Sequence, residues 1–368
     1  MSPARRVADR LPDFPWDSLA AAKATAKAHP AGIVDLSVGT PVDPVPEFIA
    51  DELRAAAQRW AGYPTVWGTA SLRSAILSYL ADRWQASGLD EPNVLPVMGS
   101  KEFVAALPSQ LGLGADDVVV IPKVAYPTYE VGALLAGCRI VRCDDPAALN
   151  ESPSLIWLNY PANPHGAIAD IELLRAWVAV ARQHDAVLAS DECYGEFGWD
   201  AEPISVLDPR VHDADSKNII AIHSMSKRSN MAGYRAAFAA GCKGVLGGLL
   251  ELRKHAGAMV PGPVQDAMSV ALSDQTHVEA QRARYLRRRD ILRSALEQAG
   301  FRIEHSEGSL YLWATRDEDG RDSVQWLADR GILVAPGDFY GNDSAQFVRV
   351  ALTATDERVE SAADRLRQ

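Results

Sequence analysis

Short apolar stretches alternate with helical patterns through the middle of the chain. Runs rich in Val, Ile and Leu recur at 94–98, 117–122, 138–143, 154–159, 186–190 and 218–224. Each run is nearly continuous in apolar residues, which is typical of strands buried on both faces. Helical patterns at 101–111, 170–184 and 243–255 separate several of these runs, and Asp170 is suited to cap the second helix. The order predicts an α/β fold with a mostly parallel sheet that helices cover on both faces.

The pattern changes after about residue 263. A long helical pattern extends to residue 300, and strand-like runs follow at 301–305 and 309–315, then a helical run at 323–330, a strand at 346–352 and a closing helix. This order is typical of an α+β unit. We therefore predict an N-terminal arm that joins the small domain over 1–40, a large domain around the parallel sheet over 41–262, and a small C-terminal domain over 263–368.

Composition and charge narrow the class of partner. Of the 368 residues, 48% are hydrophobic and 23% are charged, which is typical of a globular protein. Acidic residues outnumber basic ones 48 to 37, and the net charge of -11 argues against nucleic acid as a partner. The N-terminus lacks a signal-peptide pattern and no run is long enough to span a membrane, so we expect a cytoplasmic protein without a membrane partner.

Polar residues collect where four of the predicted strands end. The clusters are Gly99-Ser100-Lys101, the segment 160–166 with Asn163, Asp191-Glu192-Cys193-Tyr194, and Ser224-Met225-Ser226-Lys227. Each cluster alone is explained as well by a helix cap, a turn or a surface lysine. Ligands bind beyond the carboxyl ends of parallel strands, however, and four clusters at corresponding ends favour a single site.

The residue types at these ends suit the chemistry of pyridoxal 5'-phosphate. An amine such as that of Lys227 can condense with the aldehyde of this cofactor, and a carboxylate such as that of Asp191 can keep its pyridine nitrogen protonated. Tyr194 and Asn163 are candidates to bind the ring hydroxyl. The phosphate needs helix-start N–H groups, hydroxyls and a cation, and the candidates for it are Gly99, Ser100, Lys101, Ser224, Ser226 and Arg235.

Two motifs resemble those of the class I and II aminotransferases of fold type I. Residues 224–227, together with Gly233-Tyr234-Arg235, are similar to the family's Ser-x-Ser-Lys signature and its trailing glycine and arginine. Residues 163–166 (NPHG) resemble the family's Asn-Pro-x-Gly turn. The resemblance implies the fold type I architecture, a cofactor carried by Lys227, proton transfer by the same amine, and a phosphate bound by Arg235.

The same resemblance implies further roles. Tyr126 is similar to the aromatic residue that stacks on the cofactor ring, Arg349 to the arginine that binds the substrate α-carboxylate, and Gly39 to the loop that closes over this carboxylate. Tyr63 is similar to a tyrosine that reaches the phosphate in the neighbouring subunit, which implies a homodimer with shared active sites. The sequence departs from the family at Cys193, where an aliphatic residue is usual, and at Ala237, where glycine is common.

Three further segments resemble those of a particular branch of the family and so point to a substrate. The segments NYPANPHG, SDECYGEF and GSLYLW are most similar to actinobacterial N-succinyldiaminopimelate aminotransferases, which implies amino transfer from N-succinyl-L,L-2,6-diaminopimelate to 2-oxoglutarate in lysine biosynthesis. Such a substrate needs a second cation; Lys123 and Arg228 are candidates, although structural roles are favoured for both.

Several alternatives to this function stay open. An aspartate or broad-range aminotransferase and a pyridoxal-dependent β-lyase use the same core residues. A ligand-sensing regulator is disfavoured because about thirty residues precede Asp35, too few for a DNA-binding domain. A nicotinamide enzyme is disfavoured because the Gly112-Leu113-Gly114 segment lacks a third glycine.

Overall fold

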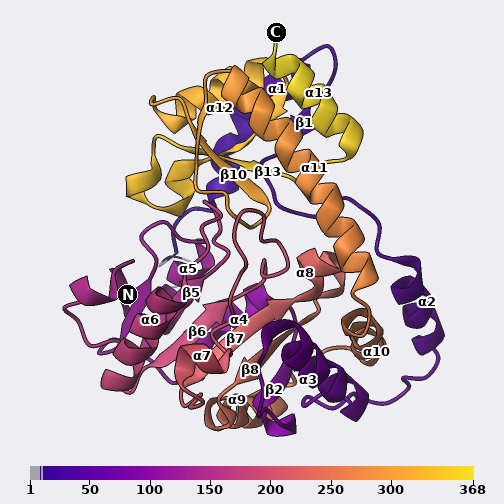
Figure 1. Ribbon diagram of the computed structural model, residues 1–368, viewed down its shortest axis with the longest axis vertical. Helices are drawn as coiled ribbons and strands as arrows, with labels where there is room; N and C mark the ends of the chain where they lie inside the picture. The colour runs from indigo at the N-terminus through magenta and orange to yellow at the C-terminus, as the bar shows by residue number, and fades with distance from the viewer. Residues whose placement is uncertain (1–8, 10) are drawn as a thin grey trace, which may run out of the picture.

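The computed structural model describes residue 9 and residues 11–368; the remaining residues of the predicted N-terminal arm lie outside the described ones. A seven-stranded sheet forms the centre of the lower body in Figure 1, with the strand order β2-β8-β7-β6-β5-β3-β4. The strands are β2 (Val94–Val97), β3 (Val118–Ile121), β4 (Arg139–Arg142), β5 (Leu155–Asn159), β6 (Val187–Asp191), β7 (Ile219–Ser224) and β8 (Ala237–Gly241). The predicted α/β architecture is therefore confirmed.

Helices cover both faces of this sheet because its strands are apolar on both sides. Val119 and Ile121 join one buried cluster and Val118 and Val120 the other, as expected when side chains alternate along a strand. The first cluster includes residues of α4 (Ser100–Gln110), α5 (Thr128–Ala136) and α9 (Lys243–Ala256). The second includes residues of α2 (Glu47–Ala56), α3 (Ala70–Trp84), α6 (Ile171–Gln183), α7 (Pro209–His212) and α10 (Gly262–Leu272).

One strand of the sheet was missed in the sequence analysis. The strand β8 lies between β2 and β7 and is antiparallel to both, whereas the other neighbours in the sheet are parallel. Its sequence, AFAAG, is short and rich in small residues, which are weak strand formers. All five residues of β8 are buried, so packing between the two layers of helices determines the strand here.

A smaller α+β body lies above the sheet in Figure 1. A four-stranded antiparallel sheet of order β12-β13-β10-β9 and a two-stranded parallel sheet of β1 and β11 form its core. The strands are β1 (Val34–Asp35), β9 (Arg302–Glu304), β10 (Tyr311–Thr315), β11 (Ile332–Leu333), β12 (Ala335–Pro336) and β13 (Val348–Ala351). The helices are α1 (Ala20–Ala28), α11 (Thr276–Gln298), α12 (Gly320–Asp329) and α13 (Asp356–Leu366).

The long helical pattern after residue 263 consists of two helices. The helix α10 ends at Leu272, and α11 begins at Thr276 after a short junction over 273–275. This break has no signal in the sequence, because the polar junction carries no proline or glycine. The apolar residues of α10 belong to the cluster under the large sheet, so the packing of this body continues beyond the predicted boundary at residue 262.

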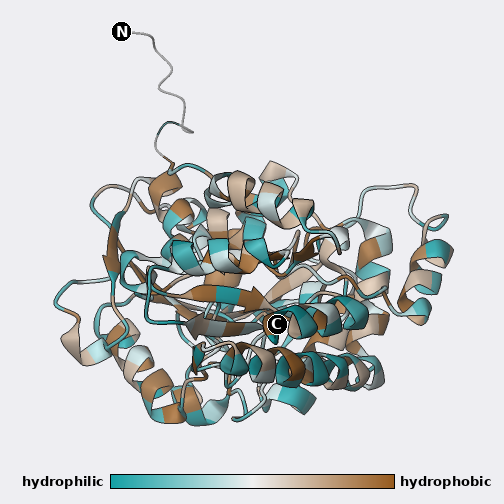
Figure 2. Ribbon diagram, turned by 90° about the horizontal axis from the view of Figure 1, so that it is seen from above, coloured by the Kyte–Doolittle hydropathy of each residue, from teal (hydrophilic) through white to brown (hydrophobic). Residues whose placement is uncertain are grey.

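The described helices combine polar and apolar residues, and the longest, α11, is rich in charged residues. Hydrophilic and hydrophobic residues alternate along the ribbons of these helices (Figure 2), as expected of helices that have one buried face. Within residues 9 and 11–368, no helix combines the length and the apolar character that a membrane span requires.

Candidate active site

The predicted strand-end clusters meet at one cavity of about 560 Å³. It opens at the carboxyl ends of β2, β5, β6 and β7, which point to the same edge of the sheet. The small body and the N-terminal segment close its other side. The sequence-predicted residues that line it are Gly39, Ser100, Lys101, Tyr126, Asn163, Asp191, Tyr194, Ser224, Ser226, Lys227, Arg235 and Arg349.

Lys227 projects into this cavity from α8 (Met225–Arg228), the single helical turn that follows β7. Ser224 caps this turn, because its hydroxyl oxygen accepts a hydrogen bond from the Ser226 N–H at 3.1 Å. The Lys227 amine donates a hydrogen bond to the Gly39 carbonyl. Burial, assisted by the positive charge of Arg349, lowers the pKa of Lys227 to about 8. A larger fraction of this amine than of an ordinary lysine is therefore unprotonated near neutral pH and can act as a nucleophile or a base.

Asp191 is buried at the end of β6 and lies on the floor of the cavity. One carboxylate oxygen accepts a hydrogen bond from the Tyr129 hydroxyl at 2.9 Å, and the other accepts one from the Cys193 N–H at 3.2 Å. Burial raises the pKa of Asp191 above its ordinary value. None of the cationic side chains described in the structure forms an ion pair with this carboxylate. It is available to a cationic group of a ligand.

The opposite end of the cavity collects groups that bind anions. Ser100 and Lys101 begin α4, where the first N–H groups of a helix have no intrahelical acceptor. Gly99 precedes them at a φ of 85°, and a methyl group on it would overlap the Arg235 guanidinium. The glycine thus allows Arg235 to lie against the helix start. Burial and the positive charge of Arg235 lower the pKa of Lys101, as expected where cations converge without an anion.

Arg349 lies on β13 of the small body and is buried against the cavity. It donates hydrogen bonds to the Asn163 side-chain oxygen at 2.8 Å and to the Ser37 carbonyl at 2.7 Å. Its guanidinium lies 4.0 Å from the centre of the Tyr311 ring. The Nε–H is buried and has no acceptor among the residues that the structure describes, so a donor remains for a bound carboxylate.

The aromatic residues of the site hold its walls in place. Tyr126 lines the cavity, and burial raises the pKa of its phenol to about 12. The N–H of the preceding Ala125 donates a hydrogen bond to the Tyr340 carbonyl at 2.8 Å, which ties this loop to the small body. The Tyr194 and Tyr311 hydroxyls lie 2.7 Å apart. A methyl group on Gly39 would overlap Tyr311, so only glycine fits this loop position.

The sequence analysis did not single out some residues of the site, and Tyr63, which it assigned to the site of a neighbouring subunit, lies outside the cavity of its own chain. Asn159 binds both the Asp191 carbonyl and the Asn163 N–H, and Tyr129 binds the Asp191 carboxylate; Asn159 at its strand end was a signal that the sequence offered. Tyr63 is 96% exposed and does not line the cavity of its own chain. The cavity is also lined by Phe14, Trp16, Lys23, Val38, Thr40 and Tyr311, which sequence patterns did not single out.

Lys123 and Arg228, the two candidates for a second substrate-binding cation, both lie outside the cavity. Lys123 lines a separate polar groove beside the N-terminal segment. Arg228 is buried and paired with Glu196. Neither side chain lines the cavity, in agreement with the structural roles that we favoured.

Comparison with known proteins agrees with this geometry. A probable aminotransferase of Mycobacterium tuberculosis is 56% identical over 367 residues, which cover 99% of this chain and 88% of that protein. The 4-dedimethylamino-4-oxo-anhydrotetracycline transaminase OxyQ of Streptomyces rimosus is 51% identical, over 97% of this chain and 99% of that one. The solved structure of a probable N-succinyldiaminopimelate aminotransferase from Thermus thermophilus is similar with a TM-score of 0.87 at 27% identity, over 96% and 99% of the two chains.

The model of the family described as aminotransferase class I and II matches residues 31–366. This range includes both bodies of the fold and almost every residue that lines the cavity. The chain belongs to the class I and II aminotransferases, a family that depends on pyridoxal 5'-phosphate.

Proposed function

We propose that this enzyme transfers the amino group of N-succinyl-L,L-2,6-diaminopimelate to 2-oxoglutarate, with pyridoxal 5'-phosphate carried by Lys227. One observation supports the proposal most. The Asp191 carboxylate ends β6, the Lys227 amine follows the neighbouring strand β7, and the Arg349 guanidinium lines the same cavity. Bound there, the cofactor supplies an electron sink for the pair left at the substrate Cα when its proton leaves.

The residues present fit this cofactor. Asp191 is a buried carboxylate without a cationic partner in the described part of the chain, and burying an unpaired charge is costly. A protonated pyridine nitrogen would compensate it. At the other end, Ser224, Ser226 and Arg235 lie with the start of α4 around the same cavity, where a phosphate would offset the converging positive charge.

Lys227 has the properties of a proton carrier at the substrate Cα. With a pKa of about 8, its amine can accept a proton and return it at neutral pH. The amine is held at the Gly39 carbonyl, beside the loop that carries the Ser37 carbonyl bound to Arg349. The proton carrier and the proposed carboxylate site therefore share one loop, which orients the substrate Cα toward the amine.

We propose that Arg349 binds the α-carboxylate of the substrate. Its planar guanidinium presents parallel N–H donors that match the two oxygens of a carboxylate. Asn163 and the Ser37 carbonyl fix its orientation, and its buried Nε–H lacks an acceptor. A carboxylate satisfies this donor, whereas leaving it unsatisfied costs about 1–3 kcal/mol.

The cavity accommodates a long anionic side chain. Besides Arg349 and the cations at the phosphate end, Lys23 lines the cavity, and this cation supports a substrate that carries a further carboxylate. The similar structure from Thermus thermophilus is that of a probable N-succinyldiaminopimelate aminotransferase. With this substrate the enzyme would serve lysine biosynthesis.

A second candidate substrate is a polycyclic ketone of the 4-oxo-anhydrotetracycline type. The relative from Streptomyces rimosus is named for such a substrate and is 51% identical along almost the whole of both chains. Phe14, Trp16 and Val38 line the mouth of the cavity, where Phe14 is 57% and Val38 44% exposed. A flat apolar substrate would cover these side chains.

We also propose that the enzyme is a cytoplasmic homodimer. Tyr63, Val42 and Phe48 are exposed apolar or aromatic side chains with 96%, 51% and 39% exposure. A second copy of this chain would cover them, and Tyr63 would then reach the site of its partner. Sedimentation of the purified enzyme tests this proposal: a dimer that dissociates on Tyr63→Arg agrees with it, and a monomer contradicts it.

Half-reactions separate the candidate functions. The enzyme loaded with cofactor is mixed with N-succinyl-diaminopimelate, glutamate, aspartate or an aromatic amino acid, and the loss of its visible absorption is timed. The proposal predicts the largest kcat/KM for N-succinyl-diaminopimelate. A faster reaction with aspartate would indicate a broad-range aminotransferase. A faster reaction with an aromatic amino acid would indicate the apolar substrate. Release of pyruvate from a sulfur-containing amino acid would indicate a β-lyase.

A further inference from the structure

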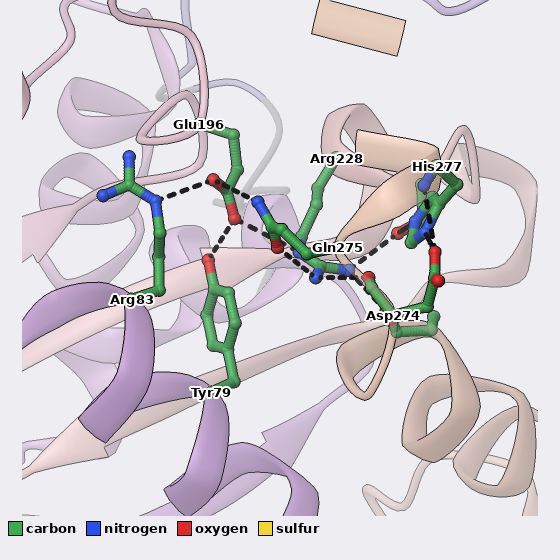
Figure 3. Close-up of polar contacts among 9 residues, drawn as sticks. Tyr79, Arg83, Glu196, Arg228, Asp274, Gln275 and His277 are labelled. Atoms are coloured by element: carbon green, nitrogen blue, oxygen red, sulfur yellow. Dashed lines mark hydrogen bonds and ion pairs between the residues drawn. The ribbon is translucent and has the colours of Figure 1, made fainter. Parts of the chain in front are cut away.

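Arg228 follows Lys227 directly, but its side chain points away from the cavity. It is buried to 2% exposure and contacts the junction between α10 and α11 (Figure 3). This junction is where the chain passes from the large body, whose core includes α10, to the small body, whose core includes α11. Arg228, the residue next to Lys227, thus contacts the segment of chain that connects the two bodies.

Every nitrogen of the Arg228 guanidinium has an acceptor. The Nε–H donates to a Glu196 carboxylate oxygen at 3.2 Å, and Nη1 donates to the Ala271 carbonyl at 2.6 Å. Nη2 donates to the Asp274 carbonyl at 3.1 Å and to the Gln275 side-chain oxygen at 3.2 Å. The last carbonyls of a helix lack intrahelical partners, so Arg228 satisfies the end of α10 and fixes the residues that follow it.

Glu196 connects Arg228 to the loop that follows Asp191 in the chain. Its carboxylate accepts hydrogen bonds from the Tyr79 hydroxyl at 2.9 Å and from Arg83 Nε at 3.0 Å, in addition to Arg228. Burial opposes its ionisation, yet the charges of Arg228 and Arg83 bring the pKa of Glu196 below its ordinary value. Breaking such a buried pair leaves an uncompensated charge, so these segments are held together as one unit.

We propose that Arg228 is a positioning residue for amino transfer, which holds α8, and with it the Lys227 amine, in a fixed place against the α10–α11 junction. The proposal rests on the proposed role of Lys227. Arginine is needed because its rigid fork reaches a carboxylate and two carbonyls at once, whereas a lysine ammonium acts as a single point. Substitution should therefore disturb the chemical step more than the binding of the amino acid.

The test compares Arg228→Lys with Arg83→Lys, two identical substitutions at the same Glu196 carboxylate. Arg83 approaches from the side away from the junction (Figure 3). We expect Arg228→Lys to lower kcat about 100-fold, since small displacements of a reacting group have effects of this size, with KM changed less than threefold. Arg83→Lys should keep kcat within threefold. Amide hydrogen exchange should accelerate at 271–277 only in Arg228→Lys.

Equal effects of the two substitutions on kcat and on exchange would overturn the proposal. A lower melting temperature with unchanged kcat and unchanged exchange at 271–277 would show that Arg228 only stabilises the fold. If Arg228→Lys does not fold, Gln275→Ala decides, because at an exposed position it removes one acceptor of Arg228 together with a weak hydrogen bond to Glu196: a severalfold lower kcat supports the proposal and an unchanged kcat refutes it. Wild-type enzyme that carries no cofactor on Lys227 would instead refute the proposed function.

Discussion

The buried surroundings of Glu192 allow the pH dependence of the protein's stability to be predicted. Glu192 is 3% exposed and His223 is 2% exposed, and Glu192 Oε2 lies 3.4 Å from His223 Nε2. Within residues 9 and 11–368, neither of these atoms has a hydrogen-bond partner. The other oxygen of Glu192 accepts a hydrogen bond from the Val206 N–H at 2.8 Å. We predict that Glu192→Gln stabilises the enzyme, and does so more strongly as the pH rises.

Burial sets the magnitude of this effect. It raises the pKa of Glu192 from 4.5 to about 7. Because the native state binds this proton more tightly than the unfolded state, the stability that it contributes is complete below pH 4.5 and is lost as the pH rises through 7. One pKa unit corresponds to about 1.4 kcal/mol, so the full loss is about 3 kcal/mol, of which about 2.5 kcal/mol falls between pH 5 and pH 8.

Glutamine avoids this loss. Its side-chain oxygen can keep the bond from Val206, and its amide can donate to His223. With an unfolding entropy of about 2 cal/mol/K per residue, a 2.5 kcal/mol difference corresponds to about 3 °C in melting temperature for a chain of this length. Scanning calorimetry of both proteins in the same cofactor state at pH 5 and pH 8 measures it.

The control is Glu202→Gln, which alters a carboxylate that is 73% exposed. The melting-temperature difference between Glu192→Gln and the wild type should widen by about 3 °C from pH 5 to pH 8, and that of the control should stay constant. A Glu192→Gln difference that is independent of pH, or that widens toward acid, would refute the assignment of a buried neutral carboxyl.

Three further predictions concern the cavity. Arg349→Lys should raise KM for the amino acid about 30-fold, the equivalent of one lost charge-assisted bond of about 2 kcal/mol, while the cofactor dissociation constant in equilibrium dialysis stays unchanged; equal loss of both would indicate a structural arginine. Gly99→Ala should weaken cofactor binding in the same assay, because its methyl group would displace Arg235, and unchanged affinity would contradict a phosphate site there. Lys227→Ala should abolish the visible cofactor absorption, and a variant that keeps it would exclude Lys227 as the carrier.

The strand ends were the part of the site that sequence could predict. Asn163, Asp191 and Lys227 each follow an apolar run, and the carboxyl ends of parallel strands meet at one edge of a sheet. The structure brings all three to one cavity. The antiparallel strand β8 and the break between α10 and α11 were not predicted, because packing and not local propensity determines them.

Other features depend on long-range contacts that no local pattern encodes. Tyr129 reaches Asp191 from a helix, and Arg349 reaches Asn163 from the small body. The N-terminal aromatic residues Phe14 and Trp16 reach the cavity only through the folded arm. The family resemblance supplied Arg349 and Tyr126, whereas Tyr129 and Phe14 had no signal in a single sequence.

The measurement that tests the account most directly is the identity of the side chain that carries the cofactor. Purified enzyme is reduced with borohydride, digested and examined by mass spectrometry for a phosphopyridoxyl group. The account predicts that this group is found on Lys227 and is absent when the protein is first treated with a competing amine such as hydroxylamine. A group on another lysine, or no group in protein reconstituted with pyridoxal 5'-phosphate, would contradict it.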